Sequence, residues 1–192
     1  MTENSDSFMS LSIIKEFQSQ PEYVNSYSLS YSYPILAIIV SSNKIVTFNL
    51  ETKVTLTLER KKPGEMNSSV LCSAISNDKM FVATGHSDSN GGELVIWSLE
   101  TKRELFSFRT NDPIVKIQFA NSPNQIFHTS LYGILTLSTI TSTIFKGISV
   151  THKEIKNYNG PVISMAVHQD FLFISAALLT ECIYINKKDF PI

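Results

Sequence analysis

The chain has 192 residues and a mass of 21.5 kDa, which at about 150 residues per domain corresponds to one domain or slightly more. Hydrophobic residues make up 43% and charged residues 17% of the sequence, a composition that excludes global disorder, because disorder requires low hydrophobicity and high charge. The 16 basic and 17 acidic residues leave a net charge of −1. This balance argues against nucleic-acid binding, which needs a clustered basic surface.

The cysteines and the apolar runs indicate the cellular compartment in which the protein is expected. Cys72 and Cys182 are too few for a disulfide framework or a zinc site, and each lies in an apolar run that favours a packed, reduced thiol. The polar, acidic N-terminus is unlike a signal peptide. The longest apolar runs, 35–40 and 171–179, are far shorter than the ~20 residues that span a bilayer. We therefore expect a soluble protein without a transmembrane segment in a reducing compartment.

The chain order of the elements predicts an all-β fold. Residues 1–20 are expected to be a lead-in with one or two helical turns at 11–17. From residue 21, short β-branched and aromatic runs alternate with polar turns, which is typical of an all-β domain. The predicted strands are 23–31, 35–40, 44–49, 54–59, 70–76, 80–84, 93–98, 104–109, 114–120, 125–130, 134–140, 142–148, 162–168, 171–176 and 182–186. No room remains between them for the helices of an α/β fold.

Internal repetition organises these strands. The tetrapeptide Leu50-Glu51-Thr52-Lys53 recurs as Leu99-Glu100-Thr101-Lys102 at an offset of 49 residues, and each copy lies between two apolar strands. Asp112-Pro113-Ile114-Val115 is matched by Gly160-Pro161-Val162-Ile163 at an offset of 48. Such a fixed period marks repeated supersecondary units. We predict units of four strands at 21–59, 67–109, 112–150 and 158–192, of which the last lacks its fourth strand.

A period in the forties with four strands per unit resembles the blades of a WD40-repeat β-propeller. The specific segment is 83–102, in which Trp97 resembles the Trp of the Trp-Asp dipeptide, Ser98 replaces its Asp, and Asp88 resembles the turn aspartate. The nearest matches to the dipeptide elsewhere are Phe48-Asn49, Leu137-Ser138 or Ser138-Thr139, and Tyr184-Ile185. His86 is expected in the turn after a second strand, so the family's His-Asp-Ser-Trp hydrogen-bond cluster is expected to be incomplete.

The resemblance implies an all-β, WD40-like β-propeller of about four blades, each a four-stranded antiparallel meander, over residues 21–192. Propellers close with four to eight blades, and WD40 propellers most often with seven. Four blades that leave the ring open would expose roughly 500 Å² of apolar area at each end. We therefore expect a partial propeller that is a fragment of a larger one, or that completes its ring with a partner or a second copy. Closure of the four units alone is the third alternative.

A second resemblance concerns the cellular setting. Residues 71–102, and the strand Ile117-x-Phe119 after Asp112-Pro113-Ile114, resemble degenerate WD40 repeats in the N-terminal propellers of endosomal tethering-complex subunits, of which the vacuolar-sorting subunit of CORVET is one. This resemblance implies a cytoplasmic protein of endosomal or vacuolar vesicle tethering and protein transport. It also implies peripheral membrane association through partner proteins.

The sequence contains little that indicates catalysis. A Gly-rich phosphate loop, a nucleophile elbow, a His-Glu-x-x-His segment and a paired Cys motif are all absent. His86 and Asp88 are expected in a solvated turn, His128 half-buried on a strand and His152 solvated in a connection. We predict no catalytic residues, no cofactor and no metal. The alternative is a propeller-type or β-sandwich enzyme, which requires three or more convergent His, Asp or Glu side chains.

The main hypothesis is a non-catalytic scaffold for protein–protein interaction, because propellers present rims of loops on which binding concentrates. One rim is predicted from the turns near 59–69, 86–91, 110–113, 129–132, 157–160 and 177–180. The candidate contact residues are Arg60, Lys61, Lys62, His86, Asp88, Arg109, Asp112 and Tyr132. The basic run 60–62 is either a solvated loop or a contact with an acidic partner or anionic lipid. The expected partners are proteins, including other subunits of a large complex, and not nucleic acid.

Overall fold

A computed structural model describes residues 26–29, 35–41, 44–49, 52–59, 68–143, 147–177 and 179–185. The predicted lead-in at 1–20, its helical turns at 11–17, and the basic run Arg60-Lys61-Lys62 lie outside these ranges. All regular structure within them is β-strand.

The strands follow one another in chain order. Their bounds are β1 Ser26–Leu29, β2 Ile35–Ser41, β3 Lys44–Asn49, β4 Thr55–Glu59, β5 Ser69–Ile75, β6 Phe81–Asp88, β7 Gly91–Ser98, β8 Arg103–Thr110, β9 Ile114–Phe119, β10 Gln125–Ser130, β11 Ile134–Thr143, β12 Gly147–Asn157, β13 Val162–His168, β14 Phe171–Ala176 and β15 Leu179–Tyr184.

These strands form successive antiparallel meanders. Sheet 1 is β1–β4, sheet 2 is β5–β8, sheet 3 is β9–β12, and sheet 4 contains β13–β15 among the described residues. Every hydrogen-bonded neighbour within a sheet is also a neighbour in sequence. The arrangement confirms the predicted fold of WD40-like meander blades. It contradicts the Greek-key pairing that a β-sandwich would show.

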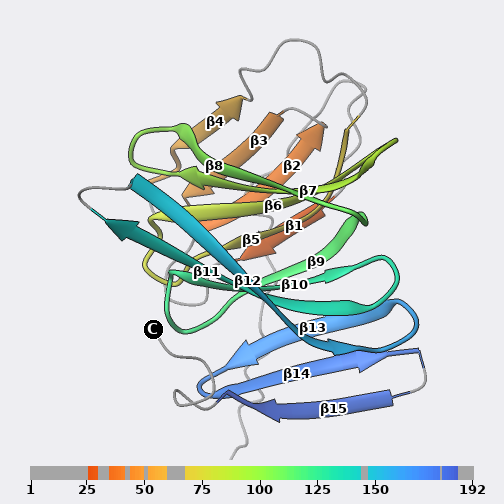
Figure 1. Cartoon of the computed structure of the whole chain (residues 1–192). Coiled ribbons are helices and arrows are strands. Elements are labelled where there is room, and N and C mark those ends of the chain that lie inside the picture. The colour runs from red at the N-terminus through yellow and green to blue at the C-terminus, as the bar shows by residue number, and fades with distance from the viewer. Residues whose placement is uncertain are drawn as a thin grey trace, which may run out of the picture.

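The sheets are stacked in chain order, with sheets 1 and 4 at opposite ends of the stack (Figure 1). The first strands neighbour one another in the order β1, β5, β9, β13. The first strand of each sheet is therefore the inner strand, and the fourth strand of sheets 1 to 3 lies at the outer edge. The chain forms a series of blades fanned along one side of a propeller.

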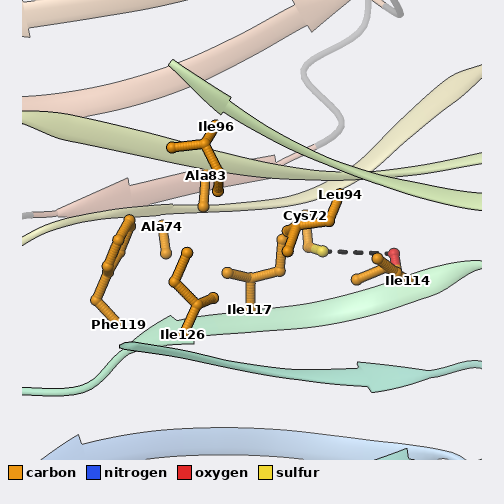
Figure 2. Packing of buried hydrophobic residues seen from close by; sticks show 9 residues of the cluster. All are labelled: Cys72, Ala74, Ala83, Leu94, Ile96, Ile114, Ile117, Phe119 and Ile126. Atoms are coloured by element: carbon orange, nitrogen blue, oxygen red, sulfur yellow. Dashed lines mark hydrogen bonds between the residues drawn. The ribbon is translucent and has the colours of Figure 1, made fainter. Parts of the chain in front are cut away.

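Apolar clusters between the sheets hold this stack together. Because side chains alternate across a strand, neighbouring residues of β6 serve different clusters: Val82 packs toward sheet 1 and Ala83 toward sheet 3. Figure 2 shows the central cluster, in which Cys72, Ala74, Ala83, Leu94 and Ile96 of sheet 2 meet Ile114, Ile117, Phe119 and Ile126 of sheet 3. A third cluster joins sheets 3 and 4. Sheets 2 and 3, which lie inside the stack, therefore bury both of their faces.

The described residues of the two copies of the sequence repeat, Thr52-Lys53 and Thr101-Lys102, share the same turn features. The Thr52 amide donates to Asn49 Oδ1 at 2.9 Å, and the Thr101 amide donates to Ser98 Oγ at 3.1 Å. Lys53 and Lys102 both adopt the left-handed conformation, with φ of 59° and 56°. The tetrapeptide therefore encodes the hairpin between the third and fourth strands of a blade.

A β-bulge recurs at the start of the first strand of sheets 2, 3 and 4. In sheet 2, Val70 pairs with His86 but Cys72 pairs with Gly85, so one residue is skipped. The pairings of β9 with β10 and of β13 with β14 skip one residue in the same way. A bulge adds a residue and increases local twist. Its recurrence shows that the three sheets are versions of one unit.

Backbone hydrogen bonds at the hairpins show which residues of the blades are equivalent. They decide the match to the Trp-Asp dipeptide in sheet 3 and correct the match in sheet 4. The backbone amides of Leu99, Ile140 and Ile185 make equivalent bonds to the turn before the second strand, at 2.6–2.9 Å. Trp97-Ser98 therefore corresponds to Ser138-Thr139, which decides between the two alternatives for sheet 3. In sheet 4 it corresponds to Ile183-Tyr184, and the match to Tyr184-Ile185 is wrong by one residue.

Several predicted strand bounds are also wrong. The last strand of sheet 3 was predicted at 142–148 but occupies Gly147–Asn157, and β6 extends to Asp88 where a turn was predicted. Polar residues dominate both extensions, so they lack the apolar signal from which strands are predicted.

Gly85 provides a test of the packing between sheets 2 and 3. A Cβ at this position would lie 2.6 Å from Cys72 Sγ, 2.7 Å from Ile114 Cγ2 and 2.9 Å from the Ile114 carbonyl oxygen. Gly85→Ala is expected to lower the free energy of unfolding by about 1–3 kcal/mol, the cost of overpacking. Urea denaturation measures it. Gly160→Ala is the control, because no heavy atom lies within 4 Å of its Cβ position, and a change within about 0.5 kcal/mol is expected. Equal effects of both variants would contradict the packing.

Candidate functional site

The turns predicted to form one rim converge in the structure. The Leu131 amide donates to the Pro113 carbonyl at 2.8 Å, and the Tyr158 amide donates to the Gly133 carbonyl at 3.0 Å. Gly133 has φ of 88°, and a Cβ there would lie only 2.0 Å from the Gly160 carbonyl oxygen. Backbone contacts of this kind fix the turns 111–113, 131–133 and 159–161 against one another. The rim is therefore preorganised.

A pocket of about 290 Å³ opens at this rim between sheets 2 and 3. Sheet 2 contributes Phe108 and Arg109, and the connection to sheet 3 contributes Asp112. His128 and His152 of sheet 3 line the pocket from the other side. The lining thus combines one aromatic ring, two imidazoles and charged groups of both signs.

Four of the predicted contact residues lie on this rim. Asp88 accepts a hydrogen bond from the Asn90 amide at 2.8 Å and forms an ion pair with Arg109. Asp112 is half-buried in the pocket wall, and Tyr132 is 63% exposed in the turn after β10. The structure therefore brings together Asp88, Arg109 and Asp112, with Tyr132 on the same rim. Their role as partner contacts stays a prediction, as it does for Arg60, Lys61 and Lys62.

His86 is placed differently from the sequence interpretation. It lies within β6 and is 1% exposed, so the expectation of a solvated turn is wrong. Its Nε2 lies 2.9 Å from Thr84 Oγ1, which accepts a hydrogen bond from Trp97 Nε1 at 3.0 Å. The side chains of Thr84 and His86 lie on the same face of β6, and Trp97 packs on that face. In place of the His-Asp-Ser-Trp cluster, which was expected to be incomplete, the blade has a chain of three hydrogen-bonded side chains, Trp97, Thr84 and His86. Its histidine lies on the second strand of the blade.

Sheet 3 has its own polar chain, which the sequence did not predict. Ser138 Oγ lies 2.9 Å from His128 Nε2 and 2.8 Å from His152 Nδ1. By the alignment of the blades, Ser138 occupies the position of Trp97, and His128 occupies that of Thr84. The equivalent place in the two sheets therefore holds a hydrogen-bonded polar chain of different composition.

His152 links this chain to sheet 2. It was expected in a solvated connection, but it lies in β12 directly opposite Ser138 and is half-buried. Its ring stacks on Phe108 of sheet 2, with ring centroids 3.7 Å apart. His128, expected to be half-buried, is fully buried. The connection was misread because β12 extends nine residues past the predicted end of its strand at 148.

Burial keeps both imidazoles neutral. It lowers the pKa of His128 to about 4, and the nearby His152 adds to this effect. Burial also lowers the pKa of His152. The Ser138 hydroxyl can donate to one neutral ring and accept from the other, so both of its hydrogen bonds form without a charge. The charges of the pocket are therefore carried by its rim residues Arg109, Asp112 and Glu154.

A further polar contact joins sheets 3 and 4. Lys156 Nζ and Tyr158 Oη both donate to the Glu181 carboxylate, the latter at 2.6 Å. These hydrogen bonds lower the pKa of Glu181. Burial, and then the Glu181 carboxylate, raise the pKa of Tyr158. The contact fixes β12 against β15.

The nucleophilic and metal-binding groups offer little for catalysis in the part of the chain that is described. Ser138 is fully buried, and burial raises the pKa of the Cys72 thiol to about 12. Within the described ranges, no cluster of three His, Cys, Asp or Glu side chains could hold a metal ion. The same ranges contain no helix with the length and apolar character to cross a membrane.

No protein-family model and no curated protein matches the chain. Solved structures do match, and they share the WD40 β-propeller fold. The chain is similar to the WD40 repeats of RRP9, with 18% identity and a TM-score of 0.61 over 85% of this chain and 47% of that one. It is similar to U3-55K, with 17% identity and a TM-score of 0.62 over 89% and 54%.

A chain of the mitotic checkpoint complex matches as well, with 10% identity and a TM-score of 0.58 over 93% of this chain and 57% of that one. The chain thus spans about half the length of the structures it matches. Together with the meander sheets, the matches show that its fold is part of a WD40 β-propeller.

Thr84→Val tests the buried chain in sheet 2. The substitution keeps the shape of the side chain but leaves the Trp97 indole N–H and His86 Nε2 without the hydroxyl. We expect the free energy of unfolding to fall by about 1–3 kcal/mol, the cost of unsatisfied buried groups. Thr57→Val on the exposed side of β4 is the control, and a change within about 0.5 kcal/mol is expected. Equal stability of Thr84→Val and wild type in urea would refute the chain's structural role.

The low pKa of His128 predicts a loss of stability in acid. Above pH 6.5 the ring is neutral in both states and contributes nothing. Between pH 6.5 and about 4 only the unfolded state binds the proton, so stability falls by about 1.4 kcal/mol per pH unit. Urea denaturation at pH 6.5 and 5 should therefore differ by about 2 kcal/mol from this residue.

The matched variant is His128→Gln, which cannot titrate. It should flatten the pH dependence of the free energy of unfolding. A His128→Gln profile as steep as that of wild type would show that the buried ring is not the cause.

Proposed function

We propose that the protein is a non-catalytic scaffold that binds other proteins through the rim formed by the turns 89–90, 111–113 and 131–133. The observation that carries this proposal is a pocket of about 290 Å³ lined by Arg109 and Asp112 beside backbone-fixed turns, with Asp88 paired to Arg109. Preorganised turns bind without the entropic cost of ordering a loop.

The rim has the composition of a protein-binding surface. Tyr and Arg are enriched among the residues that dominate binding energy, and here Tyr132 and Arg109 are both exposed. The pocket beside Arg109 is lined by two neutral imidazoles and by charged groups of both signs. It suits a polar side chain of a partner, flanked by charges of both signs. His86, which is buried, is not part of this surface.

The structural matches support an assembly role. One of the similar chains comes from a structure described as a mitotic checkpoint complex, a multiprotein assembly. This chain spans about half of that one. The scaffold role of the whole protein is therefore part of the proposal.

We place this scaffold in endosomal or vacuolar vesicle tethering, in the cytoplasm, with membrane association through its partners. The support is the resemblance of 71–102 to the propellers of tethering-complex subunits. Co-fractionation of the tagged protein with endosomal or vacuolar membranes, reversed by high salt, is the expected result. Exclusive recovery in a membrane-free fraction would refute this setting.

The rim is tested by a triple variant, Arg109→Ala, Asp112→Ala and Tyr132→Ala. The control, Arg103→Ala, Glu100→Ala and Tyr27→Ala, removes the same residue classes elsewhere at exposed positions. We expect the rim variant to lose roughly fivefold or more in the recovery of its specific partners by quantitative affinity capture, while the control keeps them. Both variants should retain the wild-type β-sheet spectrum. Undiminished capture by the rim variant, or equal loss in the control, would contradict the assignment.

A further inference from the structure

The pocket between sheets 2 and 3 has two carboxylates in its lining. Asp112 comes from the turn after β8, and Glu154 comes from β12. At about 290 Å³ the pocket lies at the lower end of the sizes of ligand sites. It therefore suits one long side chain of a partner rather than a large cofactor.

The charges of the pocket do not cancel. Within the described ranges, neither the Asp112 nor the Glu154 carboxylate forms a hydrogen bond or an ion pair. Arg109 also lines the pocket, but it is paired with Asp88 and lies opposite Glu93 in register. Its charge is therefore compensated without Asp112 or Glu154. The excess of negative charge favours a cationic ligand group.

The backbone around Asp112 is held tightly. The Thr110 hydroxyl donates to the Asp112 carbonyl at 2.7 Å. A Cβ at Gly92 would lie only 2.4 Å from the same carbonyl oxygen, so the turn packs directly on β7. The position of Asp112 is thus fixed before a ligand binds, which lowers the entropic cost of binding.

The pairing of β12 places Glu154 beside the stacked rings. Glu154 comes two residues after His152, so both side chains lie on the same face of sheet 3. That face is turned toward sheet 2, because the His152 ring stacks on Phe108. The second carboxylate therefore shares a wall of the pocket with an imidazole and faces an aromatic ring.

The two imidazoles add a hydrogen-bond acceptor to this lining. His128, which is 4% exposed, uses Nε2 for Ser138, so its Nδ1 is left for a ligand. His152 uses Nδ1 for the same hydroxyl, and its Nε2 has no partner in the described part of the chain. Because the hydroxyl carries one proton, it donates to one neutral ring and accepts from the other. One of the two remaining nitrogens is then a lone-pair acceptor and the other an N–H donor.

The stacked rings favour a planar cation. The ring centroids of Phe108 and His152 lie 3.7 Å apart, with 24° between the ring planes. A guanidinium is planar, carries five N–H donors and stacks on aromatic faces, whereas an ammonium is a compact point charge. A cation near an aromatic face is also attracted by the ring. The lining therefore matches arginine better than lysine.

We propose that this pocket binds an arginine side chain of a partner protein, with hydrogen bonds from its guanidinium to Asp112 and Glu154 and the Phe108–His152 stack beside it. The inference rests on the proposed scaffold function, because it names the partner residue that the rim recognises. Hydrogen bonds from guanidinium to carboxylate are charge-assisted and strong. An acidic or uncharged side chain would leave the two carboxylates uncompensated when the pocket closes over it.

Titration with short peptides, followed by nuclear magnetic resonance, tests the ligand class. The probes are three acetylated, amidated tripeptides with arginine, lysine or citrulline between two glycines; citrulline has nearly the shape of arginine but no charge. We expect the arginine peptide to saturate with a dissociation constant on the order of 1 mM. The lysine peptide should bind about threefold or more weaker, and the citrulline peptide about tenfold or more weaker. Absence of saturation, or equal affinity for any two of the peptides that include arginine, would overturn the proposal.

Paired carboxylate variants test the location. Asp112→Asn with Glu154→Gln should weaken binding of the arginine peptide by about tenfold or more. The control is Glu100→Gln with Asp170→Asn, which removes the same charges at exposed positions and should bind like the wild type. Both double variants should keep the wild-type urea midpoint. Unchanged affinity in the pocket variant, or an equal loss in the control, would contradict the site.

The titration is independent of the affinity capture that tests the scaffold function, because it needs no partner. If the arginine peptide fails to bind while the rim variant loses its partners, the arginine proposal fails and the scaffold function stands. If the peptide binds but the rim variant captures its partners undiminished, the scaffold function fails, and the partner assigned to the pocket fails with it.

Discussion

The structure depends on one constraint: a meander sheet with apolar residues on both faces must be covered on both sides. In β6 the consecutive residues Val82 and Ala83 belong to two different clusters, one shared with sheet 1 and the other with sheet 3. At about 25 cal/mol per Å² of buried apolar area, these contacts are the main favourable contribution to stacking. The constraint orders the sheets along the chain, so that sheets 2 and 3 each pack between two neighbours.

Hydrogen-bonded polar chains occur where the apolar pattern is interrupted. Trp97, Thr84 and His86 are linked inside sheet 2, and Ser138 links His128 to His152 in sheet 3. Burial lowers the pKa of both imidazoles in the second chain, so that chain is neutral and its burial carries no charge penalty. The second chain also reaches across to sheet 2 through the stacked ring of Phe108. It lies beneath the rim pocket, which connects the packing of the blades with the surface proposed for binding.

The sequence predicts the blades because the signals that define them are local. The repeated Leu-Glu-Thr-Lys segment and the alternating apolar strands are visible without a structure, and the described residues of both copies make the same turn hydrogen bond. Strand ends made of polar residues are not visible in this way. Asp88 ends β6 at the rim, and the residues after 148 extend β12 at the outer edge of sheet 3. Both extensions are mostly polar and show no apolar alternation.

The candidate site is only partly readable from the sequence. The sequence predicts that Asp88, Arg109 and Asp112 lie near one rim, because turns at the ends of strands share a rim, and the structure brings them together. His86 and His152 were misplaced, because their burial depends on partners supplied by neighbouring strands and by the register that the bulge sets. A polar residue whose hydrogen bonds are made inside a sheet has the same local signature as one in a loop.

The most direct test of this account is a set of methyl and side-chain nuclear Overhauser effects across the interface of sheets 2 and 3. The stacked blades predict strong contacts from Ile114 and Ile126 to the side chains of Ala74, Ala83 and Leu94. A spectrum in which these isoleucines contact only residues of their own sheet would contradict the stacked arrangement.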